Sequence, residues 1–415
     1  MRALISLFDR ISPAHMRSVL DVGYLFGLRL VQKILGLVSF YFLVRVLDQD
    51  EFGTYSFIIS LVMAGAIFAL SGMINAVMQS VARGYLGSYF RAVPVVFCVS
   101  FVGSAVFSGV AFMYYDPNDP QLYYGLLIAA ALFPFASALK LWHGFVAGQE
   151  KFARFAQLEG TMFVLMHGGL VSACLLGVTE IPIFISIIFG VQGMYNVAVL
   201  IWHYGHRQRE GEEFETGNLS YGIRTSLYDG IFVISEHLDK LLLFTVVSPA
   251  NLAIYTIADR ISELIRYLVN AIASVLSPKF ARTDTYTLRL DRMIKIFCIA
   301  FGAVCILFSF TLMPPLIIWL FGEGYAASIP IAQGLIVAGV FGNHATLQFR
   351  YIRSHMDEES YRHITIATSL ILITVSSIFI PLLGLWGAVL SMFLYRVMMA
   401  LVIHNLIRKR YLHSS

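Results

Sequence analysis

The sequence is short of charge. Only 13% of its 415 residues are Asp, Glu, Lys or Arg, and 58% are hydrophobic, whereas a soluble domain carries about a quarter charged residues. The mean hydropathy is +0.75. Such a chain is expected to be an integral membrane protein. Its net charge of +4, with no basic patch beside a recognisable nucleic-acid module, excludes nucleic acid as a partner.

Cysteine and enzyme motifs are scarce as well. The four cysteines, Cys98, Cys174, Cys298 and Cys305, all fall within apolar stretches, where we interpret them as packing residues rather than disulfides or metal ligands. The chain has no P-loop, no nucleophile elbow and no metal-ligand spacing. We therefore expect no cofactor, no metal and no catalytic residue.

Long hydrophobic runs are what the sequence has in abundance. A membrane helix needs about 20 mostly apolar residues, and cutting the runs at polar or Gly/Pro-rich breaks predicts twelve spans. They cover residues 20–42, 53–75, 92–114, 121–146, 157–177, 182–203, 221–247, 251–277, 292–314, 326–349, 363–381 and 384–407. The first is a full-length span and is expected to be an uncleaved anchor.

Loop charge indicates the orientation. Lys and Arg gather before the first span, in the even-numbered loops and after the last span, whereas the odd-numbered loops carry Asp and Glu, with Arg45 as the exception. Short loops rich in Lys and Arg stay in the cytoplasm. This predicts a multi-pass protein of the bacterial inner membrane with a cytoplasmic N-terminal segment (1–19) and tail (408–415).

Two short matches suggest an internal repeat. The segment that ends at Tyr55 resembles the one that ends at Tyr255, an offset of 200, and the segment at Arg83 resembles the one at Arg282, an offset of 199. We interpret the halves as two six-helix bundles, 20–203 and 221–407, joined by a cytoplasmic linker (204–220). Six spans per half give a parallel repeat about an axis along the membrane normal. Coincidence between apolar segments is the alternative.

Charged residues inside the spans are the candidate functional residues. Each costs about 2.5–3.5 kcal/mol on the insertion scale, so it tends to face a cavity. Arg29 and Lys33 share one helix face because they are four residues apart. The deep positions hold six basic residues against four acidic ones, which predicts an anion-binding interior: Arg29, Lys33, Lys240, Arg260, Arg266 and Arg396 against Glu236, Asp239, Asp259 and Glu263.

Some of these charges have simpler interpretations. Glu263 with Arg260 or Arg266 could be an ion pair that only holds helices together. Lys140, Glu159, Arg224 and Lys295 lie close to helix ends and are expected to reach the headgroups. Three histidines on separate spans are interpreted as cavity or packing residues: His167, His237 and His344.

Several motifs together resemble a known family. Glu51-Phe52-Gly53-Thr54-Tyr55-Ser56 after an acidic stretch is similar to the opening motif of the Wzx-type polysaccharide-transport flippases, in the multidrug/oligosaccharidyl-lipid/polysaccharide (MOP) exporter superfamily. Further matches are Tyr255-Thr256-Ile257-Ala258-Asp259-Arg260, Phe321-Gly322-Glu323-Gly324-Tyr325 and Gly384-Leu385-Trp386-Gly387-Ala388. The resemblance implies an all-α, MATE-like fold of twelve helices in two bundles.

The resemblance also implies a function. Such a flippase moves an undecaprenyl-pyrophosphate-linked oligosaccharide across the inner membrane by alternating access. Membrane lipids, a polysaccharide polymerase and chain-length machinery are implied partners. The residues expected to attract the pyrophosphate are Arg29, Lys33, Lys240, Arg266 and Arg396, and the carboxylates expected to couple transport to protons or sodium are Glu236, Asp239, Asp259 and Glu263.

Two rival classes remain open. A MATE-like drug/cation antiporter would have an acidic, aromatic cavity. A membrane-bound polysaccharide polymerase would place catalytic residues in a long outer loop, and the sequence has no loop of that length.

Overall fold

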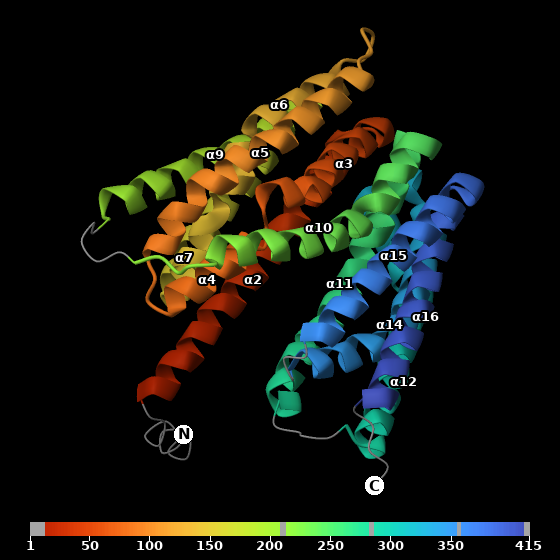
Figure 1. The fold of residues 1–415 in the computed structure, drawn as a ribbon. Helices are drawn as coiled ribbons and strands as arrows, with labels where there is room; N and C mark the ends of the chain where they lie inside the picture. The colour runs from red at the N-terminus through yellow and green to blue at the C-terminus, as the bar shows by residue number, and fades with distance from the viewer. Residues whose placement is uncertain (1–12, 208–212, 282–285, 355–357, 411–415) are drawn as a thin grey trace, which may run out of the picture. The chain divides into compact units, whose positions relative to one another are not determined.

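The chain is almost entirely helical in the computed structural model, which describes residues 13–207, 213–281, 286–354 and 358–410 (Figure 1). Internal contacts divide it into two compact units. The first comprises Met1–Val46 and Ala66–Leu227, and the second comprises Leu47–Gly65 and Tyr228–Ser415. The chain therefore passes between the units three times, once within an α-helix, because α10 (Asn218–Leu242) contributes residues to both.

The first unit is a bundle of helices around an apolar core. Its long helices pack as the pairs α2 with α8, α5 with α6 and α6 with α9, and the last two pairs run side by side in Figure 1. The core centres on the fully buried Tyr89 and Trp142. The indole of Trp142 donates to Asn196 at 2.9 Å. The helices are α2 (Pro13–Val46), α4 (Met73–Ala82), α5 (Gly87–Met113), α6 (Gln121–Ser137), α7 (Trp142–Gly148), α8 (Phe152–Leu175) and α9 (Ile181–Gly205).

The second unit is built around α14, which packs against α11, α12 and α16, while α15 lies along α16. These helices run side by side in Figure 1. A second apolar core lies between them and includes the buried Tyr351, Leu347 and Ile403. The helices are α3 (Gln49–Ala64), α11 (Pro249–Ala281), α12 (Leu288–Thr311), α13 (Met313–Phe321), α14 (Ser328–Ser354), α15 (Glu358–Leu383) and α16 (Leu385–Arg410).

Helix α3 belongs to the second unit because its first turn and Gly53 contact the start of α11. Asp48 and Glu51 form a capping box that begins the helix, which satisfies two N–H groups of the first turn. Asp50 then accepts the N–H of Ala250 at 3.1 Å. A Cβ placed on Gly53 would lie 1.9 Å from the carbonyl oxygen of Pro249. Only glycine allows α3 to approach α11 this closely.

The predicted span 53–75 is not one helix. The chain leaves α3 through a 3-10 turn, Gly65–Ala69, and then Leu70 adopts a φ of 46° before α4 begins. A left-handed leucine interrupts the hydrogen-bond ladder of a helix, so the apolar run continues while the helix does not. The predictions 121–146 and 292–314 likewise each cover more than one helix, since turns follow α6 and α12. The pattern of apolar residues along the chain does not show such breaks.

Nine helices of the described residues are long and apolar enough to cross a membrane. They are Phe26–Val46, Gln49–Ala69, Gly87–Met113, Gln121–Gly148, Phe152–Leu175, Ile181–Gly205, Leu288–Thr311, Arg362–Leu383 and Leu385–Lys409. The other three predicted spans coincide with α10, α11 and α14, which have 25, 33 and 27 residues. Polar and charged residues in the middle of these helices lower their hydropathy.

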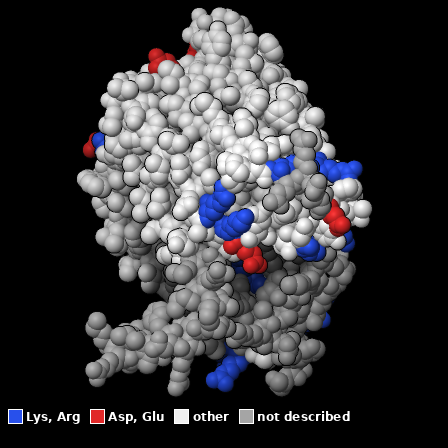
Figure 2. Space-filling view, turned by 90° about the vertical axis from the view of Figure 1, so that its left-hand side faces the viewer, with Lys and Arg blue, Asp and Glu red and all other residues white. Residues whose placement is uncertain are grey.

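The outer surface is apolar. Many large hydrophobic side chains are exposed, among them Phe112, Leu176, Ile299 and Trp319. Figure 2 shows one face on which the charged side chains are gathered in limited zones and a broad area carries none. So many exposed large hydrophobic side chains would be unusual on a soluble monomer, and they provide the surface that lipid tails require. The chain is a multi-pass membrane protein.

Parts of three predicted segments lie outside the described residues. These are residues 1–12 of the N-terminal segment, 208–212 of the linker, which include Glu210 and Glu212, and 411–415 of the tail. Arg282, on which one of the repeat matches depends, also lies outside them.

Candidate functional site

The second unit contains a polar cavity of about 700 Å³. Its wall is formed by residues of α3, α10, α11, α14, α15 and α16. All four predicted carboxylates line it, together with three arginines: Glu236, Asp239, Asp259, Glu263, Arg260, Arg266 and Arg396. Seven charges around one hollow within an apolar bundle identify this as the candidate site.

Asp259 is the centre of the ion pairs. Its carboxylate lies 2.8 Å from Lys240 Nζ on α10 and 2.8 Å from Arg266 Nη2, two turns further along α11. All three side chains are largely buried. The spacing of seven residues brings Arg266 over Asp259 on the same helix face, whereas the contact with Lys240 joins two helices.

Asp239 is held differently from its neighbour Lys240. Its carboxylate is buried, accepts the phenol hydroxyl of Tyr255, and also accepts the backbone N–H of Lys240 at 2.7 Å. Two hydrogen bonds to neutral donors satisfy part of the carboxylate without neutralising it. Asp239 is therefore the buried acid of the cavity with no ion pair within 4 Å among the described residues.

Glu263 pairs with Arg260 at 3.0 Å across one helical turn, and both side chains are over one-third exposed. The sequence interpretation was an ion pair that holds helices together, but this pair lies within one helix, α11. A pair this exposed contributes little to stability. Arg260, Arg266, Arg396 and Lys240 balance the four carboxylates that line the cavity. The positive excess expected from the sequence therefore depends on Arg29 and Lys33.

Three polar atoms in the cavity wall are buried and have no hydrogen-bond partner among the residues that the structure describes. They are Arg396 Nε on α16, Asn343 Nδ2 on α14 and His237 Nδ1 on α10. Glu236 also lines the cavity and forms no hydrogen bond or ion pair among the described residues. Buried polar groups are nearly always satisfied in folded proteins, so these atoms are available to a ligand. The sequence pattern did not indicate Asn343 because one asparagine in an apolar run has no distinctive spacing.

Arg29 and Lys33 lie on α2 in the first unit, whereas the cavity residues belong to the second unit. Arg29 is exposed and Lys33 is half-buried. A carboxylate does face this part of α2, because Gln32 donates to Glu159 of α8 at 3.4 Å and Arg29 interacts electrostatically with Glu159. The sequence of the first span alone contains no such partner.

Glu159 was expected to extend to the headgroups, and this is wrong. Its side chain is buried and approaches His143 Nε2 to 2.7 Å. The turn between α6 and α7 places His143 against α8, which position along the chain did not predict.

A second polar cluster, in the second unit, was missed from the sequence. Asp291 is buried near the start of α12 and accepts hydrogen bonds from Tyr286 at 2.8 Å and from Gln348 at 3.1 Å. His344 Nε2 lies 3.0 Å from the same carboxylate, and Lys295 Nζ lies 2.7 Å from it. Burial raises the pKa of Tyr286 and keeps its hydroxyl a donor. Only the pair of Asp291 with Lys295, four residues apart, could have been found from spacing.

A fold of packed membrane-spanning helices with a charged cavity is typical of secondary transporters. Solved structures share this fold. The fold matches an inward-facing multidrug resistance MATE family transporter of the MOP superfamily with a TM-score of 0.70 and 14% identity, over 91% of this chain and 94% of that chain. It also matches the lipid II flippase MurJ, in an inward closed conformation, with a TM-score of 0.67 and 13% identity, over 94% and 87%.

A third structure carries a relevant description. A MOP superfamily transporter from Pyrococcus furiosus, described as having a binding pocket of reverse polarity that suggests a different function, matches with a TM-score of 0.60 and 14% identity, over 97% of this chain and 96% of that chain. At these identities the likeness establishes the fold alone. No curated protein sequence matches the chain.

The sequence profile of the family described as "Polysaccharide biosynthesis protein" matches residues 42–330. This range covers most of the chain, and the chain belongs to that family. The resemblance predicted from the Glu51–Ser56 and Tyr255–Arg260 motifs is confirmed at this level, because both motifs lie inside the matched range.

Proposed function

We propose that this protein is a flippase that moves an undecaprenyl-pyrophosphate-linked oligosaccharide across the bacterial inner membrane by alternating access. Family membership and a fold shared with the lipid II flippase MurJ support a lipid-linked substrate. The proposal includes twelve spans, with α10, α11 and α14 crossing the membrane despite their polar residues. It also includes a parallel repeat of the halves 20–203 and 221–407, and both termini in the cytoplasm.

The observation that carries the proposal is the set of unpartnered polar atoms in the cavity wall. Sugars offer many hydroxyl groups, each of which both donates and accepts hydrogen bonds. Asn343 Nδ2, His237 Nδ1 and Arg396 Nε provide donors and acceptors for them at one cavity. An apolar drug would leave these atoms unsatisfied, at a cost of about 1–3 kcal/mol each.

In this proposal the charged residues bind the pyrophosphate or couple transport to an ion. Arg396 binds the pyrophosphate, since its Nε has no other partner, and Lys240 and Arg266 do so when a substrate anion competes with Asp259. Arg29 and Lys33 of the first unit add positive charge on the substrate path. Glu236, Asp239, Asp259 and Glu263 are the candidate groups for coupling to protons or sodium.

The test is deletion of the gene, followed by an assay for lost surface polysaccharide and for lipid-linked repeat units accumulated in the cytoplasmic leaflet. We expect complementation to fail with Arg396→Gln and with Arg29→Ala plus Lys33→Ala. The matched control is Arg224→Gln, because Arg224 is an exposed arginine of α10 that donates to its own helix at Ser220. Full activity of both site variants, at equal protein levels, would contradict the assignment.

A MATE-like cation antiporter is the second candidate, favoured by the four carboxylates of the cavity and by the fold shared with the multidrug resistance transporter. It makes the opposite prediction. The deletion would then sensitise cells to cationic drugs and leave surface polysaccharide unchanged, and Glu236→Gln would reproduce that effect.

A further inference from the structure

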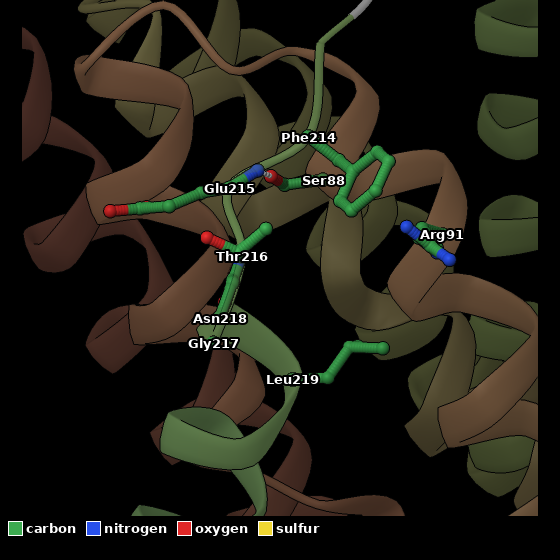
Figure 3. A pocket seen from close by; sticks show the side chains of 8 residues that line it. All are labelled: Ser88, Arg91, Phe214, Glu215, Thr216, Gly217, Asn218 and Leu219. Carbon is green, nitrogen blue, oxygen red and sulfur yellow. Dashed lines mark hydrogen bonds between the residues drawn. The ribbon is translucent and has the colours of Figure 1, made fainter.

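The first unit has a separate pocket of about 240 Å³ where the linker enters α10 (Figure 3). It is lined by Ser88 and Arg91 of α5 and by residues 214–219. None of these residues belongs to the proposed transport site, which lies in the second unit and on α2.

The pocket contains an orphaned polar side chain. Asn218 is only 7% exposed, and neither its Oδ1 nor its Nδ2 has a hydrogen-bond partner in the described part of the chain. Its backbone N–H bonds the carbonyl of Glu215 at 3.4 Å, but the amide group itself caps nothing. A buried amide with both atoms unsatisfied costs free energy, and a ligand that both donates and accepts would recover it.

Positive charge lies beside this amide. The Arg91 guanidinium stacks on the Phe214 ring at 3.7 Å and makes no hydrogen bond or ion pair within the described parts of the chain. The Ser88 hydroxyl oxygen accepts the N–H of Glu215 at 3.0 Å, which leaves its proton to donate. In the first turn of α10, the N–H groups of Asn218 and Tyr221 already bond the carbonyls of Glu215 and Gly217, which leaves those of Leu219 and Ser220 without an acceptor in the helix.

The one carboxylate in the lining is neutralised elsewhere. Glu215 accepts from Ser80 at 2.5 Å and from Arg83 at 2.6 Å, and Figure 3 shows its side chain pointing away from Arg91. The pocket therefore presents a net positive charge, hydrogen-bond donors and one amide carbonyl. This combination is complementary to a phosphate group that carries a hydroxyl or ammonium beside it.

We propose that this pocket binds the headgroup of a membrane phospholipid, with the phosphodiester at Arg91, Ser88 and the start of α10, and the headgroup alcohol or amine donating to Asn218 Oδ1. The pocket lies at the first turns of α5 and α10, next to the exposed Arg83 and the exposed apolar Leu86. Headgroups meet the ends of membrane helices at this depth, which favours a lipid over free phosphate.

The test is binding of dihexanoyl phosphatidylethanolamine, phosphatidylglycerol and phosphatidylcholine to the purified full chain in detergent, measured by native mass spectrometry, with inorganic phosphate as a fourth probe. Choline has no donor for Asn218. We therefore expect the ethanolamine and glycerol lipids to bind about tenfold more tightly than the choline lipid, a difference that one satisfied buried acceptor can supply.

Two variants test the two parts of the site separately. Asn218→Leu, which preserves side-chain size, should abolish the preference for the ethanolamine and glycerol lipids over the choline lipid. Arg91→Leu should lower the binding affinity for all three lipids about tenfold. The matched control is Arg154→Leu, since Arg154 stacks on Trp202 at 3.9 Å in the same unit but does not line the pocket. Its lipid binding should stay within about twofold of the wild type.

Several outcomes would overturn the proposal. The first is equal affinity of the wild type for all three lipids. The second is a loss of lipid affinity in Arg154→Leu as large as that in Arg91→Leu. The third is binding of inorganic phosphate without binding of lipid. Should either variant fail to fold, photo-crosslinking of the wild-type chain with an azide-labelled phosphatidylglycerol should label peptides 86–93 and 213–221. Labelling elsewhere alone would be equally decisive against it.

Discussion

Lys240 Nζ on α10 lies 2.8 Å from the Asp259 carboxylate on α11, and the same carboxylate also holds Arg266. The largely buried Asp259 carboxylate thus forms ion pairs with two cations. A buried charge that loses its partner destabilises a protein more than the pair stabilises it. Neutralising Asp259 and neutralising Lys240 should therefore lower the stability of the protein by different amounts.

Asp259→Asn should destabilise the protein more than Lys240→Met, because the first leaves two cations without an acceptor and the second leaves Asp259 with Arg266. We expect losses of roughly 3–5 kcal/mol for Asp259→Asn and about half of that for Lys240→Met. The measurement is the thermal unfolding midpoint of the purified protein in detergent. Arg224→Gln, an exposed neutralisation on α10, should leave the midpoint unchanged. Equal midpoints for the two site variants would contradict the role of Arg266 as a second partner.

The Asp291 cluster should contribute to stability rather than transport. Asp291→Ala removes the acceptor that Tyr286 and Gln348, both fully buried, share. Gln348 keeps its 3.4 Å bond to the Tyr286 oxygen, but the Tyr286 hydroxyl loses its acceptor, at about 1–3 kcal/mol. The control is Lys295→Gln, because the Lys295 side chain is 48% exposed and its pair is expected to contribute below about 1 kcal/mol. A lowered unfolding midpoint for the first variant alone is the expected result. Similar unfolding midpoints for both variants would show that the cluster does not contribute to stability.

Gly53 should tolerate no side chain. A Cβ at this position would meet the Pro249 carbonyl oxygen at 1.9 Å, and a backbone atom cannot rotate away as a side chain can. Gly53→Ala should therefore separate α3 from α11 and cost at least about 2 kcal/mol. Gly36→Ala is the control, since Gly36 lies in α2 with open space around its Cβ position. It should be neutral or slightly stabilising, and a comparable loss at both sites would show that close approach is not the cause.

The attachment of the linker to the first unit should weaken in acid. Hydrogen bonds from Arg83 and Ser80 hold the pKa of Glu215 below its usual value of 4.5. A depressed pKa in the folded state gives stability that is present above pH 4.5 and is lost as the pH falls through the folded pKa. Hydrogen exchange of residues 213–217 between pH 7 and pH 3 should speed up in the wild type once the intrinsic rate is corrected for.

Glu215→Gln should show that faster exchange already at pH 7 and little further change in acid. Glu213→Gln is the matched control, since its carboxylate is exposed and makes no hydrogen bond within the described residues. It should behave as the wild type. An acid response that persists in Glu215→Gln would assign the pH dependence to another group.

The candidate site shows how far sequence could go. Residues 236–240 and 259–266 could be placed on one face each from helical spacing, and both stretches do line or adjoin one cavity. Their partners could not be assigned in this way. Asp259 had Arg260, Arg266 and Lys240 as possible cations, and the contacts with Lys240 and Arg266 depend on the crossing of α10 with α11.

The sequence by itself determined that the chain lies in a membrane, which stretches of it are helical, and which family it belongs to. These follow from local properties, since the transfer of an apolar run into lipid adds up residue by residue. Tertiary structure alone decided that α3 joins the second unit, that Leu70 breaks the second span, and that Asp291 gathers Tyr286, His344 and Gln348. Each of these depends on contacts between helices far apart in the chain, and a pattern along one helix carries no information about the residue that faces it.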